Sequence, residues 1–162
     1  METMSVTARV AGTEDVPSLL RLYRGLETEM TTLHPMWPLA DGLAEPVESS
    51  FEALLADPDA IVVIGEIDGY PFGFTAARVE EMLPQAQDEK VGSIRLIYVE
   101  PEAREIALGE EMRDVVIDLL RRRGISKFDA HVLPGHRLAK NFFEAGGFSA
   151  RAIVMYHDDD EE

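Results

Sequence analysis

The sequence contains no cysteine and only one tryptophan among its 162 residues. The lack of cysteine excludes disulfides, thiolate metal ligands and a cysteine nucleophile, and it suits a reducing compartment. The four histidines do not follow the spacing of zinc ligands, so we expect no metal site. Functions that depend on a thiol or on a structural zinc are therefore excluded.

Long apolar runs and a secretion signal are also lacking. No apolar stretch approaches the roughly 20 residues of a membrane span, and no basic segment followed by an apolar one opens the chain. We therefore expect a soluble, cytoplasmic protein. With 46% apolar content, the chain should form one globular domain that buries about two-thirds of its unfolded surface.

Basic residues are scarce, since 15 Lys and Arg stand against 31 Asp and Glu, a formal net charge of -16. This charge repels phosphates, which argues against nucleic acid and anionic membranes as partners and favours a cationic acceptor such as an amine. Residues 158–162 are all acidic, so we expect a disordered tail there, after a domain that covers residues 1–157.

Hydrophobic periodicity predicts alternating strands and helices. Strands are expected over residues 6–10, 60–67, 70–79, 91–99, 127–133 and 148–157. Helices are expected after a cap at residues 13–15, over 47–56, from Arg104 onward, and over 136–145. Asp68-Gly69 favours a two-residue hairpin turn. The order predicts one α/β structure with a mixed sheet, antiparallel first and parallel later.

The strand over 91–99 is expected to run directly into a helix through VEPEAREIALG, residues 99–109. Backbone N–H groups at a helix start have no intrahelical acceptor, and the helix dipole adds partial positive charge. The junction is therefore a candidate diphosphate site, to which Arg104 adds a side-chain charge. The alternative is an ordinary capped turn.

Other polar and aromatic residues have structural interpretations beside functional ones. Glu80 is interpreted as a solvated loop residue, His131 as a satisfied strand residue and His136 as the start of a helix. The Pro-rich loop over residues 32–46 holds Trp37, which either lines an acceptor pocket or packs in the core or a dimer contact.

Two segments resemble the motifs of the GNAT superfamily of acyl-CoA-dependent N-acyltransferases. The family's pyrophosphate loop, Arg/Gln-x-x-Gly-x-Gly/Ala after Val-x-Pro, resembles REIALG at residues 104–109 after VEP. The family's Asn-x-x-Ala-x-x-Phe-Tyr-Glu-x-x-Gly-Phe resembles HRLAKNFFEAGGF at residues 136–148. The resemblance spans essentially the whole chain. It implies a single-domain GNAT-like α/β (α+β) fold, with a mixed sheet of six to seven strands flanked by about four helices.

The resemblance also implies an acyl-CoA site between the diverging strands 91–99 and 127–133. Pantetheine would pair with strand backbone near Ile97 and Val99, the diphosphate would meet N–H groups at the helix start, and an amine would attack the thioester directly. The implied cofactor-binding residues are Ile97, Val99, Arg104, Glu105, Ile106, Ala107, Leu108, Gly109, Glu110 and Phe143.

The chain departs from the family pattern at positions that matter for chemistry. Phe143 stands where members often have a tyrosine that protonates the departing thiolate, and Arg95 stands near the position of a common acidic base. Ala107 replaces the usual first glycine of the loop. Tyr98 is the nearest alternative hydroxyl, so it is the predicted catalytic residue; a core aromatic is the equal alternative.

The resemblance implies an N-acyltransferase, with acetyl-CoA as co-substrate and a small amine or protein amine as acceptor. Homodimers are frequent in the family, so a homodimer is expected. A rival interpretation is a catalytically impaired module that binds acyl-CoA or a protein partner, which Phe143 and Arg95 support. A third is a domain that binds no CoA, which the acidic residues of the loop support, namely Glu102, Glu105, Glu110 and Glu111.

Overall fold

One mixed sheet organises the chain, whose computed structural model describes residues 4–35, 37, 42–87, 89–133 and 135–160. The strands are β1 (Val6–Val10), β2 (Ala60–Ile67), β3 (Tyr70–Glu81), β4 (Lys90–Val99) and β5 (Phe128–Ala130). The α-helices are α1 (Val16–Leu33), α3 (Val47–Ala56), α4 (Leu108–Arg122) and α5 (Arg137–Ala145). Short 3-10 helices cover Thr13–Asp15, Pro84–Ala86 and Pro101–Ile106.

The sheet has the order β1-β2-β3-β4-β5. Neighbours from β1 to β4 are antiparallel, and β5 is parallel to β4. At the β2–β3 turn Asp68 and Gly69 have φ values of 52° and 82°, the left-handed conformation that a two-residue hairpin requires. The predicted mixed sheet and hairpin are therefore confirmed.

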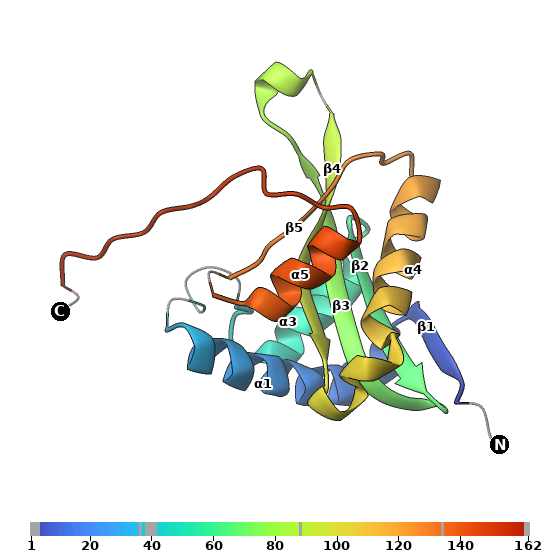
Figure 1. Cartoon of the computed structure of the whole chain (residues 1–162). Coiled ribbons are helices and arrows are strands. Elements are labelled where there is room, and N and C mark those ends of the chain that lie inside the picture. The colour runs from blue at the N-terminus through green and yellow to red at the C-terminus, as the bar shows by residue number, and fades with distance from the viewer. Residues whose placement is uncertain (1–3, 36, 38–41, 88, 134, 161–162) are drawn as a thin grey trace.

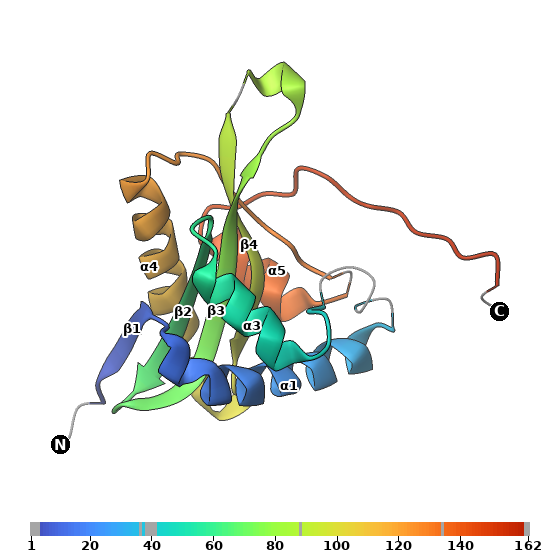
Figure 2. The ribbon, with the colours of Figure 1, turned by 180° about the vertical axis from the view of Figure 1, so that it is seen from behind.

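Helices cover both faces of the sheet (Figures 1 and 2). On one face lie α1 and α3, and the core there contains the buried side chains of Leu19, Leu22, Tyr23, Phe51 and Phe74. On the other face lie α4 and α5. The buried residues of α4 recur at helical spacing, which places one apolar stripe against the sheet: Leu108, Met112, Val116 and Leu120. In the described part of the chain, no helix has the length and apolarity to cross a membrane.

Two strand predictions are wrong. The described sheet has five strands rather than six to seven, because residues 148–157, expected as a strand, form none. Residues of high strand propensity do not make a strand without a neighbour to pair with, and this segment runs away from the body of the protein (Figure 1). The strand expected over 127–133 is also shorter, at Phe128–Ala130.

The helix expected from Arg104 begins later. A 3-10 helix occupies Pro101–Ile106, and Ala107 then adopts the left-handed conformation, with φ 59° and ψ 19°. The chain therefore turns sharply before α4 starts at Leu108. This conformation is unfavourable for a residue with a Cβ. The hydrophobic periodicity of the sequence therefore does not predict it at Ala107.

Candidate active site between β4 and α5

β4 and β5 pair briefly and then diverge. They pair over residues 92–94, and the His131 N–H donates to the Ile94 carbonyl at 3.1 Å. Ile94 and Leu96 face consecutive residues of β3, so Arg95 between them is the extra residue of a β-bulge. A bulge bends its strand and interrupts pairing. The bulge therefore accounts for the divergence of β4 from β5 beyond Arg95.

A narrow hollow lies where the two strands separate. Its volume is about 30 Å³, close to the volume that one water occupies in the liquid. Side chains of β4, of α5 and of the segment between β5 and α5 line it: Arg95, Leu96, Ile97, His131, His136 and Ala139. Leu26 and Met30 of α1 also reach it. Any acyl group that enters must move these side chains.

The start of α4 adjoins this region. The first N–H groups of α4 have no acceptor within the helix, and at Gly109 the backbone comes close to α5. A Cβ there would lie 3.3 Å from the Phe142 ring and 3.7 Å from Val99 Cγ2. Gly109 therefore allows the helix start to approach both β4 and α5.

Arg104 is already paired in this structure. Its Nε donates to the Val99 carbonyl at 2.9 Å, and an Nη nitrogen donates to the Glu29 carboxylate on α1. Its guanidinium also lies 5.7 Å from the centre of the Tyr98 ring. The side chain ties the 3-10 segment to α1 and to the end of β4, so its charge is partly neutralised before any diphosphate binds.

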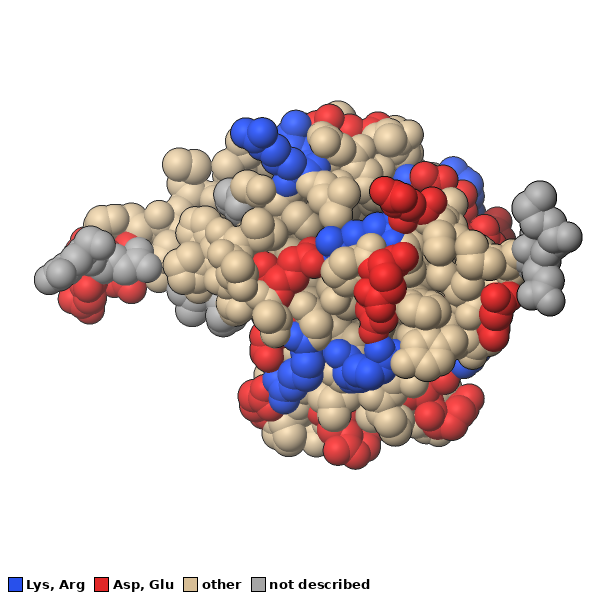
Figure 3. All heavy atoms as spheres, turned by 60° about the horizontal axis from the view of Figure 1, so that its bottom comes forward, with Lys and Arg blue, Asp and Glu red and all other residues tan. Residues whose placement is uncertain are grey.

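The four acidic side chains of the junction, Glu102, Glu105, Glu110 and Glu111, are all exposed. Exposure lets them point into water, which reduces their repulsion of an anion nearby. Figure 3 views the lower face of the molecule in Figure 1, where α1 and the β4–α4 connection lie. Lys and Arg are interspersed there with Asp and Glu instead of forming one basic patch. The backbone N–H groups at the start of α4 are accordingly the candidate anion donors of the junction.

Tyr98 faces the α1 side of the sheet. It is 9% exposed, and its hydroxyl lies 2.6 Å from where a Cβ on Gly25 would stand. Burial, and then the nearby Glu29 carboxylate, raise the pKa of Tyr98, so the phenol stays protonated. Tyr98 is not among the described residues that line the hollow. Its catalytic role stays a prediction.

Phe143 is buried in the core on the α4 side, with 3% exposure. Its ring centre lies 5.1 Å from that of Phe142 and 5.3 Å from that of Phe148. The aromatic cluster fixes α5 against the sheet. Contact between Phe143 and a cofactor is untested and stays a prediction.

Sequence reasoning missed a pairing between Glu29 and His136. His136 Nε2 lies 3.6 Å from Glu29 Oε1, and the same carboxylate holds Arg104. Burial lowers the pKa of His136 below its ordinary 6.5; Glu29 opposes this shift and Arg104 adds to it. The imidazole is therefore neutral at pH 7 and able to accept a proton. The two residues are far apart in sequence, and no local motif joins them.

Glu80 also differs from its sequence interpretation. It belongs to β3, and its Oε1 accepts a hydrogen bond of 2.5 Å from Arg95 Nη2. The interpretation as a solvated loop residue is wrong, because β3 continues through Glu81. The pair offsets the charge of Arg95 at the edge of the hollow, which reduces its repulsion of a cationic amine.

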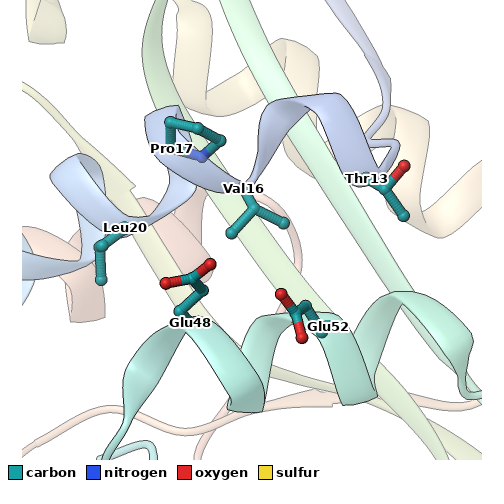
Figure 4. A pocket seen from close by; sticks show the side chains of 6 residues that line it. All are labelled: Thr13, Val16, Pro17, Leu20, Glu48 and Glu52. Carbon is teal, nitrogen blue, oxygen red and sulfur yellow. The ribbon is translucent and has the colours of Figure 1, made fainter.

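A second hollow lies between α1 and α3, with a volume of about 450 Å³ (Figure 4). Apolar side chains from the first turns of α1 form one wall, and two glutamates of α3 face them: Val16, Pro17 and Leu20 against Glu48 and Glu52. The hollow beside β4 instead meets the far half of α1, at Leu26 and Met30. The two hollows are therefore separate.

Comparison with known proteins identifies the family. Residues 21–148 match the model of the Acetyltransferase (GNAT) family, and no curated protein matches the sequence. Among solved structures, aminoglycoside 6'-N-acetyltransferase AAC(6')-Ih of Acinetobacter baumannii is similar, with a TM-score of 0.73 and 14% identity over 98% of this chain and 100% of that one.

Two further structures have the same fold. The ribosomal-protein-alanine N-acetyltransferase of Brucella melitensis biovar Abortus 2308 has a TM-score of 0.73 and 16% identity over 95% of this chain and 99% of that one. A predicted acetyltransferase of Clostridium acetobutylicum, crystallised with acetyl-CoA, has a TM-score of 0.73 and 15% identity over 95% and 96%. The GNAT motifs, the divergence of β4 from β5 and the family match agree: the chain belongs to the GNAT family of acetyltransferases.

Proposed function

We propose that this protein transfers an acetyl group from acetyl-CoA to a primary amine of a cationic acceptor. One observation, added to the family match, supports the proposal. Beyond its pairing with β5, β4 has a free edge in the described part of the chain, and this part of β4 leads to the start of α4. A strand edge suits the amides of pantetheine, and the N–H groups of a helix start suit a diphosphate. Ile97 and Val99 would supply the strand edge for pantetheine, and residues 107–110 would supply the N–H groups for the diphosphate.

Acetyl-CoA supplies an activated acyl group, and the chain must position an amine against it. The amine nitrogen attacks the thioester carbonyl carbon, the carbon–sulfur bond breaks, and CoA leaves as a thiolate. The amine loses one proton in this step and the thiolate gains one. Positioning in the hollow and backbone N–H donors near Val99 supply most of the rate.

His136 is our candidate for the proton acceptor. It lines the hollow, and its lowered pKa keeps the imidazole unprotonated at neutral pH. The negative charge of Glu29, 3.6 Å from His136 Nε2, stabilises the imidazolium that forms. The Tyr98 hydroxyl is the candidate for returning a proton to the thiolate, provided that it moves from its packing against Gly25.

A binding module with little catalysis is the second candidate function. Phe143 has no hydroxyl to donate, Arg104 is already paired with Glu29, and the hollow holds only about 30 Å³. Such a protein would bind acyl-CoA or a protein partner without rapid transfer.

Release of free CoA thiol distinguishes the two candidates. Because the chain has no cysteine, a thiol reagent reports CoA alone. We expect thiol release with acetyl-CoA and a panel of cationic amines, including polyamines, aminoglycosides and basic peptides. No release from any amine, in a protein that binds acetyl-CoA, would favour the binding module.

The variant Phe143→Tyr tests whether the protein lacks only the hydroxyl that protonates the departing thiolate. The variant restores the family's hydroxyl, so we expect the rate of thiol release to rise about tenfold or more. Phe148→Tyr is the matched control, because it adds the same hydroxyl to another ring of the cluster that does not touch Gly109, and it should leave the rate unchanged. An unchanged rate in Phe143→Tyr, with acetyl-CoA bound, would favour the binding module.

A further inference from the structure

The hollow between α1 and α3 has two walls of different chemistry. Three apolar side chains of α1 form one wall, and two carboxylates of α3 point towards it: Val16, Pro17 and Leu20 face Glu48 and Glu52 (Figure 4). The volume of about 450 Å³ lies within the range of small-molecule sites, which combine apolar walls with a few polar groups. The hollow therefore suits a ligand that has both an apolar and a cationic part.

Neither helix supplies a cation to these carboxylates. The basic residues of α1 and α3 are Arg21 and Arg24, and both have carboxylate partners elsewhere. Arg21 pairs with Glu100, and Arg24 pairs with Glu45. Among the described residues, neither glutamate of the hollow has a hydrogen bond or an ion pair. Since the two glutamates lie one helical turn apart, their charges repel each other, and a cation from outside the chain would relieve this repulsion.

We propose that the hollow between α1 and α3 is a second binding site, which takes an organic ammonium ion with an apolar body. Residues four apart on a helix have Cβ atoms about 5–6 Å apart, so one ammonium group can lie between Glu48 and Glu52 and donate to both carboxylates. The apolar body then covers Val16 and Leu20. The hydroxyl of Thr13, at the end of the hollow nearer Glu52 in Figure 4, is a further acceptor for the ammonium group.

This second site is distinct from the hollow where acetyl transfer is proposed. Val16 lies at the start of α1, whereas Met30, which reaches the hollow beside β4, lies near its end, about 20 Å away along the helix axis. The inference therefore does not depend on acetyl transfer. The net charge of -16 attracts cations to the molecule as a whole. The apolar wall selects among them the cations that carry an apolar body.

Titration of the full chain with phenethylamine, followed by backbone-amide NMR spectra, tests the site without reference to activity. Phenethylamine is cationic at neutral pH and has an apolar ring. We expect saturable shifts in the first turns of α1 and in α3, with a Kd of about 1 mM or lower. Phenethyl alcohol lacks the charge and methylamine lacks the ring, so each should bind about tenfold more weakly or worse. No saturable shift, or shifts confined to the hollow beside β4, would overturn the proposal.

A pair of double variants separates the two glutamates from the overall charge. Glu48→Gln/Glu52→Gln should raise the Kd for phenethylamine about tenfold or more, because both carboxylates become neutral. Asp114→Asn/Asp118→Asn is the matched control, since it removes two charges at the same spacing from exposed positions of α4, and it should leave the Kd unchanged. A Kd unaffected by the glutamate variant, or raised equally by both variants, would contradict the site.

Discussion

At the scale of single residues, the proposed chemistry depends on His136 and its partner Glu29. If His136 accepts the amine proton, His136→Gln should lower kcat/KM about 100-fold while the affinity for acetyl-CoA changes little. His157→Gln is the control, because His157 is exposed in the C-terminal segment. Steady-state kinetics together with a binding titration separate the two quantities. Equal activity of the His136→Gln variant and the unmodified protein would remove His136 from the mechanism.

The pH dependence of transfer tests the same pair independently. In the proposed mechanism a neutral imidazole is the active form, so protonation of His136, whose pKa lies below its ordinary 6.5, should add a fall in rate in acid. The Glu29 charge raises the pKa of His136. Glu29→Gln should therefore move the inflection of the pH–rate profile to lower pH. A shift to higher pH, or none, would contradict this arrangement.

A second single-residue feature concerns stability. Both carboxylate oxygens of Asp15 accept hydrogen bonds of 2.8 Å from Arg9, and Oδ2 accepts another of 2.8 Å from the Gly12 N–H. The Arg9 hydrogen bonds lower the pKa of Asp15 below its ordinary 3.8, against the effect of burial. The pair joins β1 to the start of α1.

Asp15→Asn should lower the free energy of unfolding at pH 7 by about 2 kcal/mol. Because the folded pKa of Asp15 lies below the unfolded one, its contribution is complete at neutral pH and is lost as pH falls through the folded value. Urea unfolding should therefore show the two proteins converging in acid. Asp118→Asn, in an exposed pair on α4, should change stability by less than about 0.5 kcal/mol. A difference for Asp15→Asn that persists undiminished in acid would contradict the ion pair.

At the scale of elements, the β4–α4 connection links the binding site to the rest of the fold. Arg104 joins this connection to α1 and to the end of β4. Removing its side chain leaves the Glu29 carboxylate unpaired near the site of the diphosphate. We expect Arg104→Ala to weaken acetyl-CoA binding about tenfold. Arg122→Ala, in a surface pair, should have no effect. Unchanged affinity in Arg104→Ala would count against the diphosphate site.

Elements with a strong periodic signal were predictable from the sequence. β2 and α3 match their predicted ranges to the residue, because local signals bound them: the Asp68-Gly69 turn follows β2, and Pro58 lies between α3 and β2, where it disfavours continuation of the helix. The bulge at Arg95 was not predictable, since it depends on how β4 pairs with β3. The left-handed conformation of Ala107 was not predictable either, because a residue with a Cβ rarely adopts it. The C-terminal segment has strand propensity, but pairing is a tertiary property.

The candidate site was predictable only in outline. The motifs around Arg104 and Ala139 indicated the family, and the match of the family model to residues 21–148 confirms it. The partners of the side chains were not predictable, because Glu29 reaches Arg104 and His136 only after α1 packs across the sheet. Long-range pairs of this kind leave no periodic trace in the sequence.

At the scale of the whole molecule, the strong negative charge bears on both substrates. A formal net charge of -16 attracts cationic amines and repels CoA, which is an anion. In the proposed function, binding of CoA therefore depends on local donors, the backbone N–H groups at the start of α4. The rest of the surface would favour the cationic acceptor that we propose.

Calorimetric titration of the purified protein with acetyl-CoA tests the central claim most directly. The site between β4 and α5 predicts saturable one-to-one binding with a micromolar Kd, accompanied by a rise in Tm as ligand stabilises the folded state. In the same experiment the Arg104→Ala variant should bind acetyl-CoA more weakly. No heat and no thermal shift up to millimolar acetyl-CoA would contradict the acetyltransferase proposal and point to a protein that works without CoA.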